Sequence, residues 1–453
     1  MELGNKKILV VGLGMSGAAT ARFLVKSGAL VSVTDAKDKS RLEKYMEGLA
    51  GLPITWHLGG HPVEAFLDAD LIILSPGVPA AIEPLRLARE RGIPVIAEVE
   101  LASRFLSDKI VGITGSNGKS TTTALTAFLL REAGFDAVAC GNIGSPLIER
   151  VADTSPERIL VVELSSFQLE TIETFQPQVA SVLNITPDHL DRYEGMEDYK
   201  RAKLRLLKNQ EPGDFVVIDA DEPHADEIAA ATQAVPYMFS RTIPLIEGVG
   251  LQDDTVVLMR GGQAMPILRA AEIGIRGPHN LGNAMAAASI AFVLGAAPEA
   301  VADGLRKFEP LEHRLEPAGE IGGVLFINDS KATNVDSAAV ALQSFDSPVI
   351  AIMGGRDKAG DFTALRPLVE QNVKQLILIG EAAPKIGMAL EGAAPAQTCS
   401  SMEEAVEAGL KAADAGDVVL LAPACTSFDM YDNFEQRGRH FKAIVRGLMN
   451  GRT

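Results

Sequence analysis

The sequence has 453 residues, with 47% hydrophobic and 22% charged side chains, and at about 150 residues per domain this length predicts three globular domains. The net charge of −17 argues against a general nucleic-acid-binding or anionic membrane surface, and no stretch reaches the roughly 18 uninterrupted apolar residues of a membrane span. Cys140, Cys399 and Cys425 are widely spaced, which favours a reduced cytoplasmic compartment over a disulfide framework.

Short β-branched runs alternate with helical patterns along nearly the whole chain, a pattern typical of βαβ units and parallel sheets. The first group of expected strands covers residues 8–11, 31–34, 54–58 and 71–74. A glycine turn, G-L-G-M-S-G at 12–17, follows the first strand, and Asp35 ends the second. This context is what a dinucleotide fingerprint requires, so an NAD-dependent oxidoreductase is one hypothesis. Any other diphosphate, or a plain tight turn, suits the same residues.

The second group of strands begins near residue 110 and leads into the run T-G-S-N-G-K-S at 114–120, before a helix expected at 121–133. Such a turn aims backbone N–H groups and the helix dipole at one point, where a phosphate binds. Lys119 supplies a charge for the β- and γ-phosphates, and the Ser120 hydroxyl is a ligand for Mg²⁺. Glu163 ends the strand expected at 159–162 and is a further Mg²⁺ ligand in the manner of a Walker B acid. The pattern predicts ATP chemistry; a non-catalytic regulator switched by ATP is the alternative.

Later polar segments have more than one interpretation. A strand expected at 179–185 leads to Asp188, His189 and Asp191, which are suited to orient a metal or a substrate, although a lone histidine is more often structural. The basic run at 199–205 is expected to be a solvated helix face, and the region 236–276 to form irregular short strands. Asn280 and Asn283 begin a helix of small residues and suit a purine or ribose contact, or a plain N-cap.

The third group of strands is expected at 324–328, 349–353, 376–379 and 418–421, after a segment at 308–314 that indicates an interdomain hinge. Polar loops follow three of these strands, at 328–334, 354–358 and 422–429. In an open parallel sheet, the loops at the carboxyl ends of the strands form the binding crevice. The lysines, serines and threonines of these loops suit a small dicarboxylic substrate.

Six motifs occur together in the order found in the Mur ligases. They are T-G-S-N-G-K-S at 114–120, G-N-I-G at 141–144, E-L-S-S-F-Q-L-E at 163–170, D-H-L-D-R-Y at 188–193, H-N-L-G-N-A at 279–284 and D-S-K-A-T-N at 329–334. The chain therefore resembles the Mur ligase family over essentially its full length. D-S-K-A-T-N, together with N-F-E-Q-R-G at 433–438, resembles the D-glutamate-adding branch. A muramate–alanine ligase or a folate polyglutamylating enzyme is the alternative within this class.

The resemblance implies an α/β fold of three domains. A Rossmann-like N-terminal domain (1–97) would bind the UDP part of a nucleotide sugar, a central P-loop ATPase-like domain (98–310) would bind ATP, and a Rossmann-like C-terminal domain (311–453) would bind the amino acid. The implied reaction adds D-glutamate to UDP-N-acetylmuramoyl-L-alanine by ATP-dependent amide ligation through an acyl phosphate, in peptidoglycan precursor synthesis. The resemblance further implies two Mg²⁺ ions, a cytoplasmic monomer, and no nucleic-acid or membrane partner.

The resemblance also assigns site residues by position. For the UDP part it implies Met15, Ser16, Asp35, Lys37, Ser75 and Gly77. For ATP it implies Gly115, Ser116, Asn117, Gly118, Lys119, Ser120, Thr121, Asn280, Asn283, Arg314 and Asp329. For the substrate carboxylate and D-glutamate it implies Asn142, Ser165, Lys331, Thr333, Lys358, Ser427 and Phe428. Ser120 and Glu163 would hold one Mg²⁺, and His189 would hold the second with Lys203 converted to a carbamate. The implied catalytic residues are Lys119, Glu163, His189 and Lys203.

Overall fold

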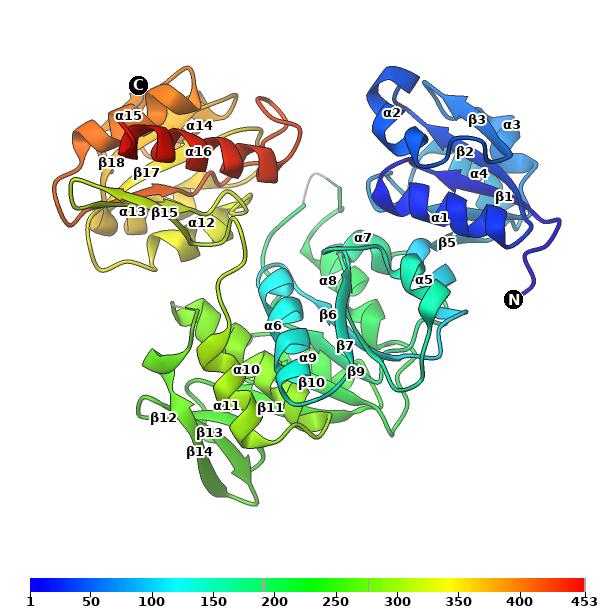
Figure 1. Cartoon of the computed structure of the whole chain (residues 1–453), viewed down its shortest axis with the longest axis horizontal. Helices are drawn as coiled ribbons and strands as arrows, with labels where there is room; N and C mark the ends of the chain where they lie inside the picture. Colours follow the sequence, from blue (N-terminus) through cyan, green and yellow to red (C-terminus); the bar gives the residue numbers. More distant parts are fainter. Residues whose placement is uncertain (190–191, 276, 452–453) are drawn as a thin grey trace. The chain divides into compact units, whose positions relative to one another are not determined.

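The computed structural model describes residues 1–189, 192–275 and 277–451, which form three sheets flanked by helices (Figure 1). Spatial contacts divide the chain into two compact units. One comprises Met1–Ile185, Glu197–Ala270 and Gly282–Arg306 and contains the first two sheets; the other comprises Thr186–Met196, Ala271–Leu281 and Lys307–Thr453 and contains the third. The predicted fold class, three α/β domains, is confirmed.

The N-terminal sheet has five parallel strands in the order β3-β2-β1-β4-β5. Leu9 and Val11 of β1 pack against Phe66 and Leu85 on one face, and α1 contacts β1 and β2. The strands are β1 (Lys7–Val11), β2 (Leu30–Asp35), β3 (Ile54–Leu58), β4 (Leu71–Leu74) and β5 (Val95–Ala97), and the helices are α1 (Met15–Lys26), α2 (Lys39–Glu47), α3 (Val63–Leu67), α4 (Glu83–Glu90) and α5 (Glu98–Ser103). The strand order reverses between β1 and β4, so the loops after these two strands flank the crevice of an open parallel sheet.

The central sheet has nine strands in the order β14-β13-β12-β11-β10-β9-β6-β8-β7. β6 therefore lies between β9 and β8, and all three run parallel. The strands are β6 (Lys109–Thr114), β7 (Ala137–Gly141), β8 (Ile159–Glu163), β9 (Val179–Val182), β10 (Phe215–Asp219), β11 (Val235–Ser240), β12 (Gly248–Gln252), β13 (Thr255–Arg260) and β14 (Gln263–Arg269). The helices are α6 (Lys119–Glu132), η1 (Leu147–Asp153), α7 (Ser166–Leu169), α8 (Met196–Leu204), η2 (Arg205–Leu207), α9 (Ala225–Ala230), η3 (Ala270–Glu272), α10 (Pro278–Val293) and α11 (Pro298–Lys307).

Two central segments differ from the sequence-based expectation. The strand expected at 179–185 ends at Val182, and the two residues after it bond to the end of β6 and to the loop that follows β6. The carbonyl of Asn184 accepts the N–H of Ser116 at 3.0 Å, for example. The region 236–276 is more regular than expected: β12, β13 and β14 form an antiparallel meander that extends the sheet.

The C-terminal sheet has six strands in the order β15-β16-β20-β17-β18-β19. Successive side chains of β17 point to opposite faces of this sheet, so the sheet has a core on each face. Ala351 and Met353 face α12, α13 and α14, whereas Ile350 and Ile352 face α15 and α16. The strands are β15 (Glu316–Ile321), β16 (Val324–Asn328), β17 (Val349–Gly354), β18 (Val373–Ile379), β19 (Ala396–Thr398) and β20 (Val418–Leu421), and the helices are α12 (Val335–Leu342), η4 (Phe362–Leu365), α13 (Arg366–Asn372), α14 (Ala383–Ala389), α15 (Met402–Ala412) and α16 (Phe434–Met449).

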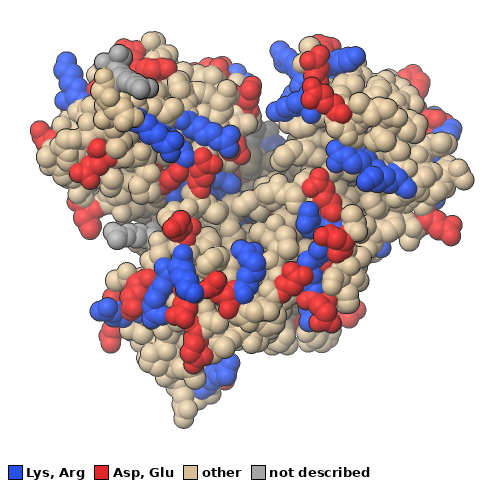
Figure 2. All heavy atoms as spheres, in the orientation of Figure 1, with Lys and Arg blue, Asp and Glu red and all other residues tan. Residues whose placement is uncertain are grey.

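The charge of the surface and the length and apolar character of the helices are ordinary for a globular chain. Figure 2 shows basic and acidic side chains interspersed over the face in view. Among the helices of the described ranges, none has both the length and the apolar character needed to cross a bilayer.

The glycine turn after β1 provides a test of the packing in the N-terminal sheet. A Cβ at Gly17 would lie 2.0 Å from the backbone oxygen of Gly12, whereas a Cβ at Gly14 would meet no atom within 4 Å. We expect Gly17→Ala to lower the free energy of unfolding by about 2 kcal/mol and Gly14→Ala to change it by less than about 0.5 kcal/mol. Urea unfolding followed by the fluorescence of Trp56, the only tryptophan, on β3, measures both. Equal midpoints for the two variants would contradict this packing argument.

Candidate active site

The loop between β6 and α6 brings two lysine side chains to one oxygen atom. Gly115 and Gly118 adopt φ values of 155° and 83°, which allow the tight strand-to-helix turn. Lys119 Nζ donates to the carbonyl of Gly115 at 2.8 Å, and Lys203 Nζ on α8 donates to the same carbonyl at 2.7 Å. The positive end of α6 and two amines therefore meet at the turn where an anionic phosphate group is expected.

Side chains from distant segments surround this turn. A Cβ at Gly118 would lie 2.3 Å from Asn283 Oδ1, so only glycine lets the start of α10 approach so closely. Asn283 is buried, and its Oδ1 accepts the Thr122 hydroxyl at 3.3 Å. The N–H of Asn117 donates to Asn184 Oδ1 at 2.8 Å. The structure thus brings Asn283 to the predicted phosphate loop and adds Asn184, which the sequence interpretation missed.

The interpretation of 199–205 as a solvated basic face is wrong for Tyr199 and Lys203. Tyr199 and Lys203 are each 1% exposed, and Lys203 Nζ lies 4.3 Å from the centroid of the Tyr199 ring. The Tyr199 hydroxyl lies 3.2 Å from Ser116 Oγ. Their spacing of four positions, one helical turn, was the signal in the sequence for a shared buried face.

Glu163 lies beside the phosphate loop because β8 pairs with β6. Ile113 and Glu163 are register partners, and Gly141 of β7 pairs with Glu163 on the other side. Asn142 Nδ2 donates to Glu163 Oε1 at 2.8 Å, and the Asn142 N–H donates to the Glu163 carbonyl at 2.9 Å. The carboxylate is 1% exposed. Glu163 therefore ends the strand next to the one that leads into the phosphate loop, and a buried carboxylate is the kind of hard oxygen donor that Mg²⁺ prefers.

Ser165 has a structural partner. Its Oγ accepts the N–H of Gln168, and Gln168 Oε1 accepts the Ser165 N–H at 3.0 Å. This capping box satisfies the first turn of α7.

In the second unit, the side chain of Asp188 links its own loop to two loops of the C-terminal sheet. Its carboxylate accepts the N–H of His189 at 2.9 Å, Nδ2 of Asn334 at 3.0 Å and Nζ of Lys358 at 3.3 Å. His189 adopts φ 56°, and its Nε2 lies 3.6 Å from Asp188 Oδ2. Asp188 therefore holds two predicted site residues, His189 and Lys358. Asp191 lies outside the described residues.

Arg314 and Asp329 come together at the start of the C-terminal domain. Burial raises the pKa of Asp329 to about 7, against the opposing effects of the Arg314 charge and a hydrogen bond from the Leu315 N–H. Lys331 follows in the same loop; its N–H donates to the His313 carbonyl at 3.2 Å, and its Nζ lies 5.0 Å from the Phe434 ring centroid. Phe434 was not among the predicted site residues.

The three polar loops predicted to share a crevice do lie together, since β16, β20 and β17 are adjacent and parallel. Arg356 and Thr426 exchange backbone hydrogen bonds of 2.9 and 3.0 Å between two of these loops. Ser427 is buried, whereas Phe428 is 61% exposed. Thr333 lies in the first loop, after Lys331.

A separate group of metal-binding side chains lies outside the predicted set. Within the described ranges, three such side chains converge at Glu312, His313 and Glu316. Lys442 Nζ lies 2.8 Å from Glu312 and 2.7 Å from Glu316, and burial lowers the pKa of His313. The ammonium group already supplies the positive charge there, so the cluster anchors the segment before β15 instead of forming a metal site.

The residues predicted for the UDP part gather around the first glycine turn. Ser75 Oγ donates to the Gly12 carbonyl at 2.8 Å. The Asp35 carboxylate accepts the N–H of Leu13 at 2.7 Å and the N–H of Lys37 at 2.8 Å. Met15 and Ser16 begin α1 directly after the glycine turn, and Gly77 lies in the loop after β4; the Met15 side chain is exposed.

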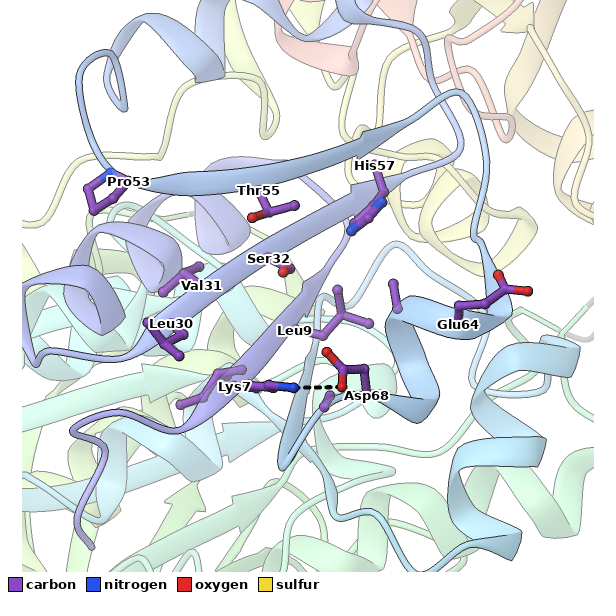
Figure 3. A pocket seen from close by; sticks show the side chains of 13 residues that line it. Lys7, Leu9, Leu30, Val31, Ser32, Pro53, Thr55, His57, Glu64 and Asp68 are labelled. Carbon is purple, nitrogen blue, oxygen red and sulfur yellow. Dashed lines mark hydrogen bonds and ion pairs between the residues drawn. The ribbon is translucent and has the colours of Figure 1, made fainter.

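A cavity of about 620 Å³ in the same domain lies elsewhere on the sheet (Figure 3). Its lining includes Ser32, Thr55 and His57 on the strands, and Lys7 pairs with Asp68 of the neighbouring segment at 2.7 Å. None of the predicted site residues lines it, because they follow the carboxyl ends of the strands and the cavity extends from the first residues of β1 and β2.

Comparison with known proteins gives consistent matches along the chain. Three family models match: "Mur ligase MurD-like, N-terminal domain" at residues 6–97, "Mur ligase middle domain" at 113–291 and "Mur ligase, glutamate ligase domain" at 313–425. UDP-N-acetylmuramoylalanine--D-glutamate ligase from Geobacter sp. (strain M21) is 44% identical over 453 residues, covering 100% of both chains. The ligase of the same name from Acidobacterium capsulatum is 45% identical, covering 98% of this chain and 97% of that one.

Solved structures support the fold. UDP-N-acetylmuramate-alanine ligase from Thermotoga maritima superposes with a TM-score of 0.63 at 19% identity, covering 98% of this chain and 100% of that one. A pseudomurein peptide ligase type C from Methanothermus fervidus gives a TM-score of 0.62 at 19% identity, with 98% and 100% coverage.

The raised pKa of Asp329 predicts a pH-dependent stability. A carboxyl group with a folded pKa near 7 and an ordinary unfolded pKa binds its proton more tightly when folded, so its contribution to stability is lost as the pH rises from about 4 through about 7. Between about pH 5 and about pH 8, we expect the free energy of unfolding of Asp329→Asn to rise by about 3 kcal/mol relative to that of the wild type. Hydrogen exchange of the β16 amides measures this difference. Parallel pH profiles for the two proteins would contradict it.

Proposed function

Since this chain belongs to the Mur ligase family, we propose that it joins D-glutamate to UDP-N-acetylmuramoyl-L-alanine in an ATP-dependent amide ligation of peptidoglycan precursor synthesis. The observation that carries this proposal is the identity of 44% over the full length to a ligase of that name. The oxidoreductase interpretation of the first glycine turn has no such support, because the matching N-terminal domain model is that of the ligase family.

We propose that residues 115–121 hold the phosphates of ATP, with Asn280, Asn283, Arg314 and Asp329 at the base, ribose and phosphates. The contact of Asn283 with Thr122 and the convergence of two amines on the Gly115 carbonyl support this site. Lys119 stabilises charge on the transferred phosphoryl group, since a fixed cation that needs no reorganisation lowers the barrier to such a transfer.

We propose two magnesium sites. Ser120 and Glu163 fit one Mg²⁺, because a hydroxyl and a buried carboxylate provide hard oxygen ligands. We assign the second to His189 and to Lys203 as its carbamate. The Lys203 amine is removed from bulk water against the Tyr199 ring. Its neutral form would attack CO₂ and lose a proton, which gives a carboxylate-like carbamate anion. The bound metal neutralises phosphate charge.

For the other substrates, we assign the UDP part to Met15, Ser16, Asp35, Lys37, Ser75 and Gly77. Asn142 and Ser165 adjoin Glu163 and are assigned to the muramoyl end of the substrate. D-Glutamate is assigned to Lys331, Thr333, Lys358, Ser427 and Phe428, where loops from three adjacent parallel strands supply two lysines for two carboxylates.

The reaction has two steps. The alanine carboxylate of the first substrate attacks the γ-phosphorus of ATP, which releases ADP and leaves an acyl phosphate. The neutral amine of D-glutamate then attacks the acyl carbon, loses a proton, and expels phosphate as the amide forms. Because an acyl phosphate hydrolyses in water, the site must exclude water between the steps. We further propose domain limits of 1–97, 98–310 and 311–453, and a monomer in the cytoplasm.

The central test is phosphate release from the purified protein with ATP, Mg²⁺ and UDP-N-acetylmuramoyl-L-alanine. We expect release to require D-glutamate and not L-glutamate, L-alanine, L-lysine or meso-diaminopimelate, because the chain matches D-glutamate ligases over its whole length. Mass spectrometry of the product should show one added glutamyl residue. Release that depends on another amino acid would overturn the assigned acceptor.

The carbamate assignment predicts chemical rescue. Lys203→Ala removes the amine and should lower turnover by about a thousandfold, since a metal-ligating group is lost. A short-chain carboxylic acid in the assay should partly restore turnover, because its carboxylate can occupy the space left by the lysine side chain. Lys208→Ala on the same segment is the control. Lys208 is exposed, so this variant should keep full activity. An active Lys203→Ala protein without added acid would rule out this role.

A further inference from the structure

Arg437 on α16 is one of the largest fully buried side chains of the protein. It is 1% exposed, and it lies beneath the polar loops that follow β16 and β20. Its Nε donates to Ser330 Oγ at 3.0 Å and its Nη2 to the Ser330 carbonyl at 2.8 Å. Its Nη2 and Nη1 also donate to the carbonyls of Cys425 and Thr426, at 3.1 and 3.2 Å. One guanidinium thus ties two site loops together.

Every acceptor of this guanidinium is neutral. Among the ion pairs of the described residues, none includes Arg437, so its charge has no carboxylate within ion-pair distance in those parts of the chain. Burial lowers the pKa of Arg437 to about 10, which still leaves it charged at neutral pH. Asp429, which is partly exposed, is a neighbouring negative charge that favours the charged form. A buried charge without a close counter-ion lowers the stability of the fold. Such groups are found mainly at functional sites.

The third loop of the predicted amino-acid site also reaches this charge. A Cβ at Gly355, directly after β17, would lie 3.1 Å from Arg437 Nη1. The three loops that meet the guanidinium carry Lys331, Ser427 and Lys358, all assigned to D-glutamate. The ligand assigned to these loops carries two carboxylates. It therefore adds negative charge above Arg437, which forms no ion pair with any carboxylate of the described residues.

We propose that Arg437 is a positioning and specificity-determining residue that selects an amino acid with two carboxylates through its buried charge, without touching the amino acid. This inference rests on the proposed function. In a low-dielectric interior, the field of a charge reaches a neighbouring site with little screening, so losing it weakens binding of a dianion more than of a monoanion.

The test separates the charge from the hydrogen bonds. Arg437→Lys keeps the charge and loses most of the donors, whereas Arg437→Gln keeps an amide donor and loses the charge. We expect Arg437→Gln to raise KM for D-glutamate about tenfold and Arg437→Lys to raise it less than about threefold. KM for UDP-N-acetylmuramoyl-L-alanine should stay within about twofold in both variants, since the residues assigned to its UDP part lie on the N-terminal sheet. Thermal unfolding confirms that each variant is folded.

A second readout is specific to charge. D-Glutamine has the shape of D-glutamate with a neutral amide in place of the side-chain carboxylate, and its competitive inhibition constant measures binding. The preference for D-glutamate over D-glutamine should fall about tenfold in Arg437→Gln and persist in Arg437→Lys. Equal effects of the two substitutions on KM and on this preference would show a purely structural role and overturn the proposal.

A further variant tests the effect of charge on D-glutamate binding even if Arg437→Gln does not fold. Asp429→Asn removes the neighbouring negative charge and keeps an oxygen for the N–H of Glu381, which Asp429 accepts at 3.0 Å. We expect KM for D-glutamate to fall by about twofold to threefold. An unchanged or higher KM would contradict the proposal. A wild-type protein that does not use D-glutamate at all would instead refute the proposed function, so the two failures are distinguishable.

Discussion

The candidate site depends on the parallel pairing of strands within each sheet. Parallel strands end at a common edge, so residues that follow different strands become neighbours although they are far apart in the sequence. In the central sheet, the β9-β6-β8-β7 order brings Asn184, the phosphate loop, Glu163 and Asn142 to one edge. In the C-terminal sheet, the adjacency of β16, β20 and β17 does the same for the three loops that carry Lys331, Ser427 and Lys358.

The same edges hold polar groups that a purely structural core would avoid. Lys203, Glu163 and Arg437 are almost completely buried, and each is held by hydrogen bonds to backbone carbonyls or a side-chain amide. Such groups cost stability when they lose their partners. Their hydrogen bonds fix the loops in place, which pre-organises a site that must bind several anionic groups in a protein of net charge −17.

The segment before the C-terminal domain is attached to that domain by a dense set of contacts. His313 packs edge-on against Phe434 with ring centroids 6.0 Å apart, and its Nδ1 lies 2.9 Å from Asn328 Nδ2. Lys442 pairs with Glu312 and Glu316 on either side. The expected hinge at 308–314 therefore has an anchored end at His313, and Arg314 next to it is held close to Asp329.

The sequence by itself determined the three α/β domains, most strands and the phosphate loop, because strand and helix periodicity and the glycine requirement of a tight turn are local properties. The motif order likewise identified the family. Only the tertiary structure decided that Tyr199 and Lys203 are buried and that Asn184 and Asp188 hold site residues. It also showed that β5, β7, β10, β15 and β19 complete the sheets. It also decided that Arg437 lies under three loops. These facts depend on contacts between residues as far as 170 positions apart in the chain, and a local sequence pattern cannot predict such a contact.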